Sequence, residues 1–378
     1  MKKFLILLLF IPVFAFAESM YSPTWGFFLD LPEGYEYIDG DGRDRFSFIG
    51  PGESMFDLVV YNNRYATMQE LINDVNRSIG NQGDYDFFQY NDSLAAIIKL
   101  IFGDYDGWGI VLELGIPEGR TDNDNTRPLL LALAYGPYDR EDMDLFHISA
   151  LDSICPTPAE RRYPGPITEY GYPRGERRRI PLASGGLHAM FYENDARGSQ
   201  ALIEREFKVL EYYISSPNWR EAWIRYYRFL YRDSYDRVAD AASVIVRSWG
   251  GPPSSGTEER RAFAQRALSL VQGHKYERDL SGSDFLNLVS VVTEGRSSCD
   301  NRSMLMAIIL SKANIQSAMM ISRQYSHAMG LVDLPGTGAR FNSHGIQWLV
   351  AETTTNIDIG LIAQDVSDPQ FWIGVIFN

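Results

Sequence analysis

Residues 294–303 read EGRSSCDNRS, and from Asp300 to Lys312 apolar residues recur at the spacing of a buried helix. Cys299 therefore stands where a Gly/Ser-rich loop meets the first turn of that expected helix. Free backbone N–H groups and the positive end of the helix dipole lower the pKa of a thiol at such a position. The same N–H groups can stabilise an oxyanion that develops beside the sulfur. The stretch predicts a reactive cysteine.

A histidine and a carboxylate follow in settings that can complete such a site. His327 opens the apolar alternation HAMGLV, and Glu352 closes a second alternation that begins at Ile346, so both segments are expected to be strands. Two adjacent strands can hold an imidazole and a carboxylate side by side, facing the start of the helix with the thiol. This is the logic of a Cys-His-acid triad, in which the histidine takes the thiol proton and the acid orients the imidazole.

Together, the three segments resemble the transglutaminase-like superfamily. The shared pattern is Gly-x-x-x-Cys-Asp opening an apolar helix, His-Ala starting a strand, and Trp-x-x-x-acid-x-Thr on the next strand, over roughly residues 258–365. The resemblance implies a papain-like fold with Cys299 as nucleophile, His327 as general base and Glu352 as the orienting acid. Glutamate replaces the family's usual aspartate, and Met329 stands where an aromatic residue is usual.

These residues predict an exported cysteine acyl-transfer enzyme, a peptidase or amidase that hydrolyses peptide or protein amide bonds. The alternative is a weakened or inactive scaffold of the same fold, which binds peptides or proteins in the cell envelope; Glu352 and Met329 favour this alternative. Arg296 and Arg340 flank the expected groove and are predicted to favour acidic or carboxylate-bearing substrates. The competing interpretation is that both arginines only solvate loops.

Two alternatives concern the nucleophile and the base. Cys155 is the other of two cysteines, and in an exported protein it could form a disulfide with Cys299. His344 is a rival base, but its polar, Gly-bounded surroundings predict a loop between the two strands.

The sequence implies neither a metal nor another cofactor, since it lacks a His-x-x-x-His helix, a Cys-x-x-Cys pair and a Gly-rich phosphate loop. Residues 39–44 begin like a calcium loop, but the twelfth position is Gly50 rather than glutamate. We expect a hairpin turn there, and another at residues 122–125.

The N-terminus and the charge indicate where the protein works. Residues 1–17 combine a basic start, an apolar run and Ala-x-Ala, the layout of a signal peptide cleaved after Ala17. No later stretch is long and apolar enough for a membrane span. A periplasmic or secreted protein is expected. With 35 basic and 49 acidic residues the net charge is −14, which argues against nucleic-acid partners.

The length of 378 residues allows two or three cores, and the expected class is α+β. Residues 18–155 predict an antiparallel sheet flanked by helices, with a weak resemblance to the Mog1/PsbP-like fold. The expected elements include strands at residues 45–49 and 55–61 and a helix that starts after a Thr67 cap and stops at Gly80.

Residues 156–181, rich in proline and arginine, predict a linker. Residues 182–257 predict an aromatic-rich helical segment, and residues 258–378 the domain with the triad. In the helical segment, Trp219, Trp223 and Tyr226 or Tyr227 fall on one helix face; we interpret this aromatic row as helix packing, with a platform that stacks glycans or peptides as the alternative.

Overall fold

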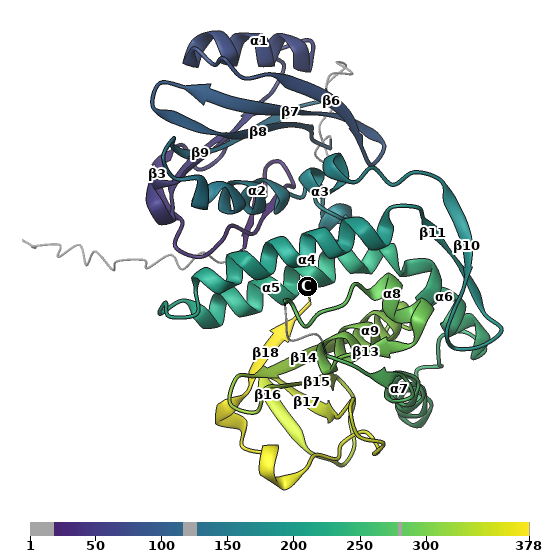
Figure 1. The fold of residues 1–378 in the computed structure, drawn as a ribbon. Coiled ribbons are helices and arrows are strands. Elements are labelled where there is room, and N and C mark those ends of the chain that lie inside the picture. The colour runs from purple at the N-terminus through teal and green to yellow at the C-terminus, as the bar shows by residue number, and fades with distance from the viewer. Residues whose placement is uncertain (1–18, 116–126, 279–281, 378) are drawn as a thin grey trace, which may run out of the picture.

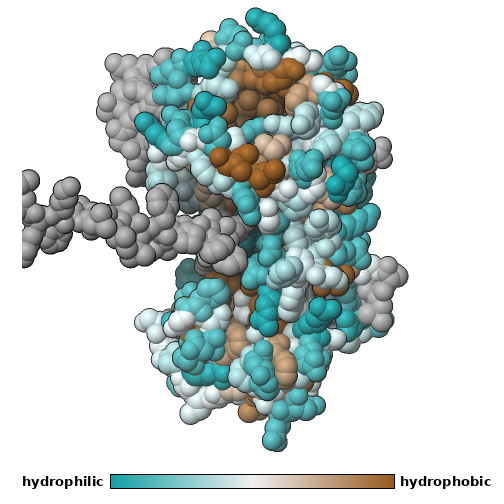
Figure 2. All heavy atoms as spheres, turned by 90° about the vertical axis from the view of Figure 1, so that its left-hand side faces the viewer, coloured by the Kyte–Doolittle hydropathy of each residue, from teal (hydrophilic) through white to brown (hydrophobic). Residues whose placement is uncertain are grey.

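The computed structural model describes residues 19–115, 127–278 and 282–377, and its fold is α+β, which confirms the predicted class. Figure 1 shows an N-terminal unit with a large sheet at the top, two long helices across the middle, and a C-terminal unit with a smaller sheet below them. Within the described ranges, no helix has the length and apolarity needed to cross a membrane. Apolar surface, brown in Figure 2, gathers mainly on the N-terminal unit in that view.

The N-terminal sheet is antiparallel, with the strand order β3-β4-β5-β9-β8-β7-β6. Its strands are β3 (Glu36–Gly40), β4 (Arg45–Ile49), β5 (Met55–Tyr61), β6 (Tyr85–Tyr90), β7 (Ser93–Phe102), β8 (Tyr105–Glu113) and β9 (Leu129–Pro137). The sequence pattern predicts β4 and β5 with these bounds. It does not reveal β3, because that strand is exposed throughout and has no alternation. A short hairpin of β1 (Met20–Tyr21) and β2 (Phe28–Leu29) precedes the sheet.

Helices cover both faces of this sheet, as expected. Helix α1 (Met68–Ile79) begins after the Thr67 cap and ends at Gly80, which adopts the left-handed conformation that favours glycine. Its buried side packs on one face of the sheet, and α2 (Asp144–Asp152) packs on the other. Successive strand residues point to opposite faces, so the central strands are apolar on both.

The predicted turn at residues 39–44 is confirmed. The Asp41 carboxylate accepts the backbone N–H groups of the three residues that lead into β4, Arg43, Asp44 and Arg45. These bonds to Oδ1 hold the pKa of the Asp41 carboxyl below its ordinary value. The second predicted turn, at residues 122–125, lies outside the described residues.

Residues 156–181 are not the solvated linker that their composition predicts. They form α3 (Pro166–Gly171) and β10 (Arg177–Pro181), which pairs with β11 (His188–Tyr192). Proline suits the first turn of α3 because its missing N–H would have no helical partner there. The segment therefore packs between the N-terminal unit and the middle helices.

The arginine run in this segment is divided between surface and interior. Arg174 is largely buried and forms ion pairs with Glu169 and Asp236, whereas the arginines of β10 are exposed. A sequence pattern cannot separate these two situations, since the partners of Arg174 come from α3 and from a helix 62 residues away.

The middle helices are α4 (Asp195–Tyr212) and α5 (Trp219–Arg237), followed by α6 (Ala239–Ser248), α7 (Thr257–Gln272), α8 (Leu288–Glu294) and α9 (Cys299–Lys312). The C-terminal sheet is antiparallel, in the order β16-β17-β15-β14-β18. Its strands are β14 (Ser317–Ser322), β15 (His327–Val332), β16 (Arg340–Ser343), β17 (Ile346–Ala351) and β18 (Ile373–Ile376). One hydrophobic core joins these helices to one face of the sheet, and it runs across the predicted boundary at residue 258.

Candidate active site

Cys299 is the first residue of α9, and the helix ends at Lys312 as its periodicity predicts. The Ser298 side chain accepts the Asn301 N–H, and the Asn301 side chain accepts the Ser298 N–H in return. This capping box satisfies free N–H groups and fixes the first turn, so the position of the thiol is set by the backbone. The thiol is 2% exposed.

His327 and Glu352 lie side by side on adjacent strands. His327 is the first residue of β15, Glu352 follows the last residue of β17, and these strands pair directly. The distance from His327 Nε2 to Glu352 Oε2 is 2.8 Å. The other oxygen, Oε1, accepts the Thr354 backbone N–H at 2.7 Å and the Thr354 hydroxyl at 2.6 Å. Glutamate therefore reaches the imidazole in place of aspartate.

These contacts also set the charge of the carboxylate. Burial raises the pKa of Glu352, but the hydrogen bond and charge of His327, together with the bonds from Thr354, outweigh burial and hold this pKa below its ordinary value. Glu352 is thus ionised at neutral pH. Because Nε2 is bound to Glu352, Nδ1 is the imidazole nitrogen that remains to accept a proton.

Cys299 and His327 line the same pocket, which has a volume of about 250 Å³. One wall consists of apolar side chains from α4 and α5, and further residues come from the segment before α8 and from the turn between β14 and β15. The wall residues from α4 and α5 are Phe207, Leu210, Trp223, Tyr226 and Tyr227. The sequence interpretation of this aromatic row as helix packing is therefore incomplete, since the row also faces the thiol.

Two groups from outside the helix of Cys299 lie near enough to the sulfur to affect its electrostatics. They are the Ala328 backbone N–H and the Tyr276 phenol. Tyr276 lies near Cys299 because its strand, β12 (Lys275–Tyr276), pairs with β13 (Arg296–Ser297), which directly precedes α9. Both groups can donate to an oxyanion formed next to the sulfur. Sequence reasoning missed Tyr276, since a two-residue strand leaves no periodic signal.

The prediction that the helix start lowers the thiol pKa is wrong. Cys299 Sγ donates to Asp300 Oδ1 at 3.3 Å, and the Tyr227 hydroxyl donates to Asp300 Oδ2 at 2.6 Å. Burial first, and then the negative charge of Asp300, raise the pKa of Cys299 above its ordinary value; the Ala328 N–H and the charge of Arg278 act in the opposite direction without compensating. The resting thiol is protonated, so a base must remove its proton.

Arg296 and Arg340 do not lie where the sequence analysis expects them. The guanidinium of Arg296 pairs with Glu294 and Glu277, and Arg340 donates to the carbonyls of Leu334 and Gly336. Neither lines the pocket with Cys299. Both arginines fix their own loops, because nearby carboxylates and carbonyls bind the guanidinium groups. The arginines that line the pocket are Arg278 and Arg323.

His344, the alternative base, and Cys155, the alternative disulfide partner, do not line the pocket of Cys299. His344 occupies the exposed turn between β16 and β17, as its surroundings predict, and lines a different pocket from Cys299. Cys155 and Cys299 are both buried free thiols in different pockets. This structure therefore has no disulfide between Cys155 and Cys299. In the described part of the chain, no cluster of three or more His, Cys, Asp or Glu side chains could hold a metal ion.

Comparisons with known proteins give distant similarities. No family model and no curated protein matches the chain. A structure from Bacteroides thetaiotaomicron VPI-5482 is 9% identical, covers 59% of this chain and 78% of its own, and has a TM-score of 0.21. A Cytophaga hutchinsonii protein, provisionally named a cysteine protease, is 8% identical over 91% of this chain and 71% of its own, with a TM-score of 0.20.

A Parabacteroides distasonis protein, provisionally named a protease, is 9% identical over 82% of this chain and 69% of its own, with a TM-score of 0.20. Similarity at these TM-scores establishes neither a shared fold nor a shared activity. The function is therefore argued from the chemistry of the site.

Proposed function

We propose that this protein is an exported cysteine acyl-transfer enzyme of transglutaminase-like type, which hydrolyses amide bonds of peptides or proteins. Cys299 is its nucleophile, His327 its general base and Glu352 the acid that orients the imidazole. The observation that carries the proposal is that His327, which contacts Glu352 at 2.8 Å, lines the same pocket as Cys299. The expected signal segment, residues 1–17, lies outside the described residues, so export belongs to the proposal.

The arrangement of these residues supports the following mechanism. His327 Nδ1 accepts the thiol proton while Cys299 Sγ attacks the amide carbonyl, and the negative charge of Glu352 stabilises the imidazolium. The Ala328 N–H and the Tyr276 phenol donate to the carbonyl oxygen as it becomes an oxyanion. The imidazolium then protonates the leaving amine, the C–N bond breaks, and a thioester remains. Water, deprotonated by His327, hydrolyses this thioester to a carboxylate and restores the thiol.

The second candidate function is a noncatalytic peptide- or protein-binding scaffold of the cell envelope. One observation favours it: burial and Asp300 keep the thiol protonated, which works against a nucleophile. The enzyme proposal answers this objection through His327, since removal of the thiol proton by a neighbouring imidazole does not require a low thiol pKa in the resting state.

Variants of Glu352 distinguish the two candidates. We expect Glu352→Ala to lower kcat/KM for a quenched fluorescent peptide by about 100-fold or more, because the imidazole loses its orientation and its stabilising charge. Glu352→Asp retains the carboxylate and should retain activity. A rise in Glu352→Asp would indicate an enzyme weakened by its glutamate. Inactivity of both wild type and Glu352→Asp, with peptide binding retained by each, would support the scaffold instead.

A further inference from the structure

A row of three aromatic rings on α5, those of Trp219, Trp223 and Tyr227, ends beside the thiol. The centres of the first and second rings are 6.1 Å apart, and those of the second and third 6.5 Å. The row forms because residues four apart lie on one face of a helix. The Tyr227 hydroxyl and the Cys299 thiol donate to the two oxygens of the Asp300 carboxylate. The row therefore connects the start of α5 with the nucleophile.

The other end of the row is positively charged. The guanidinium of Arg323 lies 5.7 Å from the centre of the Trp219 ring, and that of Arg220 lies 5.1 Å from it. Arg323 belongs to the turn between β14 and β15, and it lines the pocket of Cys299. The ring attracts the guanidinium and orients it without accepting the hydrogen bonds that a carboxylate would accept.

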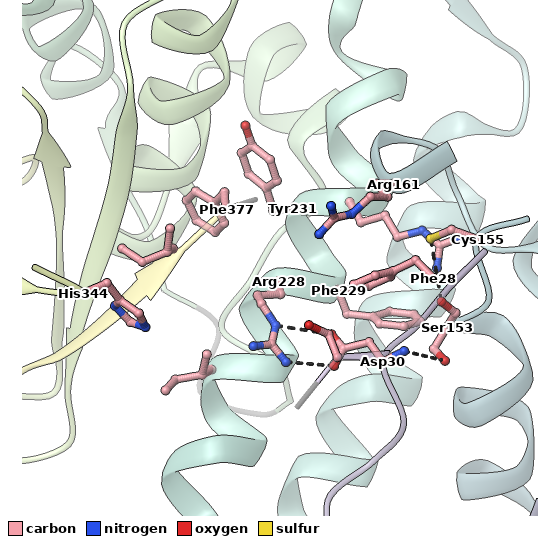
Figure 3. A pocket seen from close by; sticks show the side chains of 14 residues that line it. Phe28, Asp30, Ser153, Cys155, Arg161, Arg228, Phe229, Tyr231, His344 and Phe377 are labelled. Carbon is pink, nitrogen blue, oxygen red and sulfur yellow. Dashed lines mark hydrogen bonds and ion pairs between the residues drawn. The ribbon is translucent and has the colours of Figure 1, made fainter. Parts of the chain in front are cut away.

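Arg323 is free to bind a group of the substrate. Arg278, the other arginine of the described lining, donates to Asp284 at 2.5 Å. Likewise, Arg228 in the pocket that Figure 3 shows donates to both oxygens of Asp30. The Arg323 side chain forms neither an ion pair nor a hydrogen bond with any residue in the ranges 19–115, 127–278 and 282–377. It is exposed, so its N–H donors are accessible to a ligand.

The two ends of the row therefore have opposite charge. Asp300 places a carboxylate at the end beside the thiol, and Arg220 and Arg323 place guanidinium groups at the other end. A carboxylate of the substrate is repelled near Asp300 and attracted near Arg323. Because the whole chain has a net charge of −14, an acidic substrate gains nothing from long-range attraction and depends on this local contact.

The space between the two ends suits a large apolar side chain. Phe207, Leu210 and Trp223 are only half-buried, so they present apolar surface to the pocket. The pocket has a volume of about 250 Å³, and an apolar cavity of about 150 Å³ already holds benzene. Trp219 and Tyr227 are two helical steps of four residues apart, a rise of about 12 Å. This is about the length of three residues of extended peptide.

We propose that the site cleaves peptides in which a large apolar side chain lies next to the reacting amide and a carboxylate lies about three residues along the chain. The apolar side chain packs on Leu210 and Trp223, and the carboxylate accepts hydrogen bonds from Arg323. An acidic side chain and a free C-terminus share this chemistry. Arg323 is thus a specificity-determining residue, and the inference rests on the proposed function of Cys299.

Quenched fluorescent peptides test this substrate class. A neutral, amidated peptide with one phenylalanine receives a carboxylate about two to four residues from the phenylalanine, on either side. The carboxylate is a Glu side chain in one arm and a free C-terminus in the other, with Gln and the C-terminal amide as neutral counterparts. We expect at least one arm to raise kcat/KM about tenfold or more through a lower KM, and that arm identifies the source of the carboxylate.

Variants of Arg323 assign the preference to this residue. Arg323→Gln should bring the ratio of kcat/KM between the carboxylate peptide and its neutral counterpart close to one, because the guanidinium is lost. Arg323→Glu should reverse the preference, so that a Lys peptide is cleaved better than the Glu peptide. Arg179→Gln, which changes an exposed arginine of β10, makes the same change in net charge and should keep the wild-type ratio.

A ratio close to one in wild type, or an unchanged ratio in Arg323→Gln, would overturn the proposal. If wild type cleaves none of the peptides, the proposed function fails, and binding to Cys299→Ala then tests the recognition by itself. Fluorescence anisotropy should show about tenfold tighter binding of the carboxylate peptide than of its neutral counterpart, and Arg323→Gln in the same background should remove the difference. Equal binding of the two peptides to Cys299→Ala would contradict the recognition as well.

Discussion

Replacing Cys299 by alanine is expected to reduce peptide-amide hydrolysis by at least about 1,000-fold, because no thioester can form without the sulfur. Initial rates with a quenched fluorescent peptide measure the effect. Cys155→Ala is the matched control, since Cys155 is the other buried thiol and does not line the pocket of His327. Hydrolysis that survives in Cys299→Ala, or that disappears equally in Cys155→Ala, would remove Cys299 from the mechanism.

The largest expected effect on stability belongs to Arg225, on α5. Its side chain is 3% exposed, and it donates to Glu206 at 3.0 Å, to the Asp30 carbonyl at 2.8 Å and to the Ser149 hydroxyl at 2.9 Å. Arg225→Met should lower the free energy of unfolding by about 3–5 kcal/mol, because Glu206 remains as a buried charge without this partner. Urea denaturation measures the change.

Arg220→Met is the control for this stability prediction. Arg220 is on the same helix but exposed, so its replacement should change the free energy of unfolding by less than about 0.5 kcal/mol. Equal destabilisation by the two variants would contradict the prediction. It would show that the buried contacts of Arg225 do not stabilise the packing of the N-terminal unit on the middle helices.

The segments with local signals could be predicted from the sequence. Helix α9 and strand β15 have the bounds that their periodicity indicates, and α1 starts and stops at the predicted cap and glycine. The contact between His327 and Glu352 could also be predicted. A residue that begins one strand and a residue that ends the next can meet when those strands are antiparallel neighbours.

The electrostatics of the thiol could not be predicted in the same way. Asp300 is adjacent to Cys299 in sequence, but its effect depends on a buried carboxylate that Tyr227 holds in place from 73 residues away. Burial of the sulfur is likewise a tertiary effect, and here it outweighs the local influence of the helix start. The environment of Cys299, rather than its position on α9, decides its protonation.

The contacts of Arg296 and Arg340 could not be predicted from the sequence for a related reason. Arg296 and Arg340 are close in sequence to the expected groove, yet each finds acceptors in its own neighbourhood, and neither lines the pocket with Cys299. Arg278 and Arg323, which line it, lie in stretches without a motif. Long flexible side chains follow the nearest strong acceptor, and that acceptor is known only once the loops are placed.

The central claim is that His327 activates Cys299, and the most direct measurement is the rate of iodoacetamide alkylation of Cys299 between pH 5 and 10. Because burial and Asp300 raise the thiol pKa, Cys299 without a base should react appreciably only at alkaline pH. We predict that His327→Ala lowers the rate at pH 7 by at least about tenfold and leaves reactivity only at high pH. Identical pH profiles in wild type and His327→Ala would contradict the account.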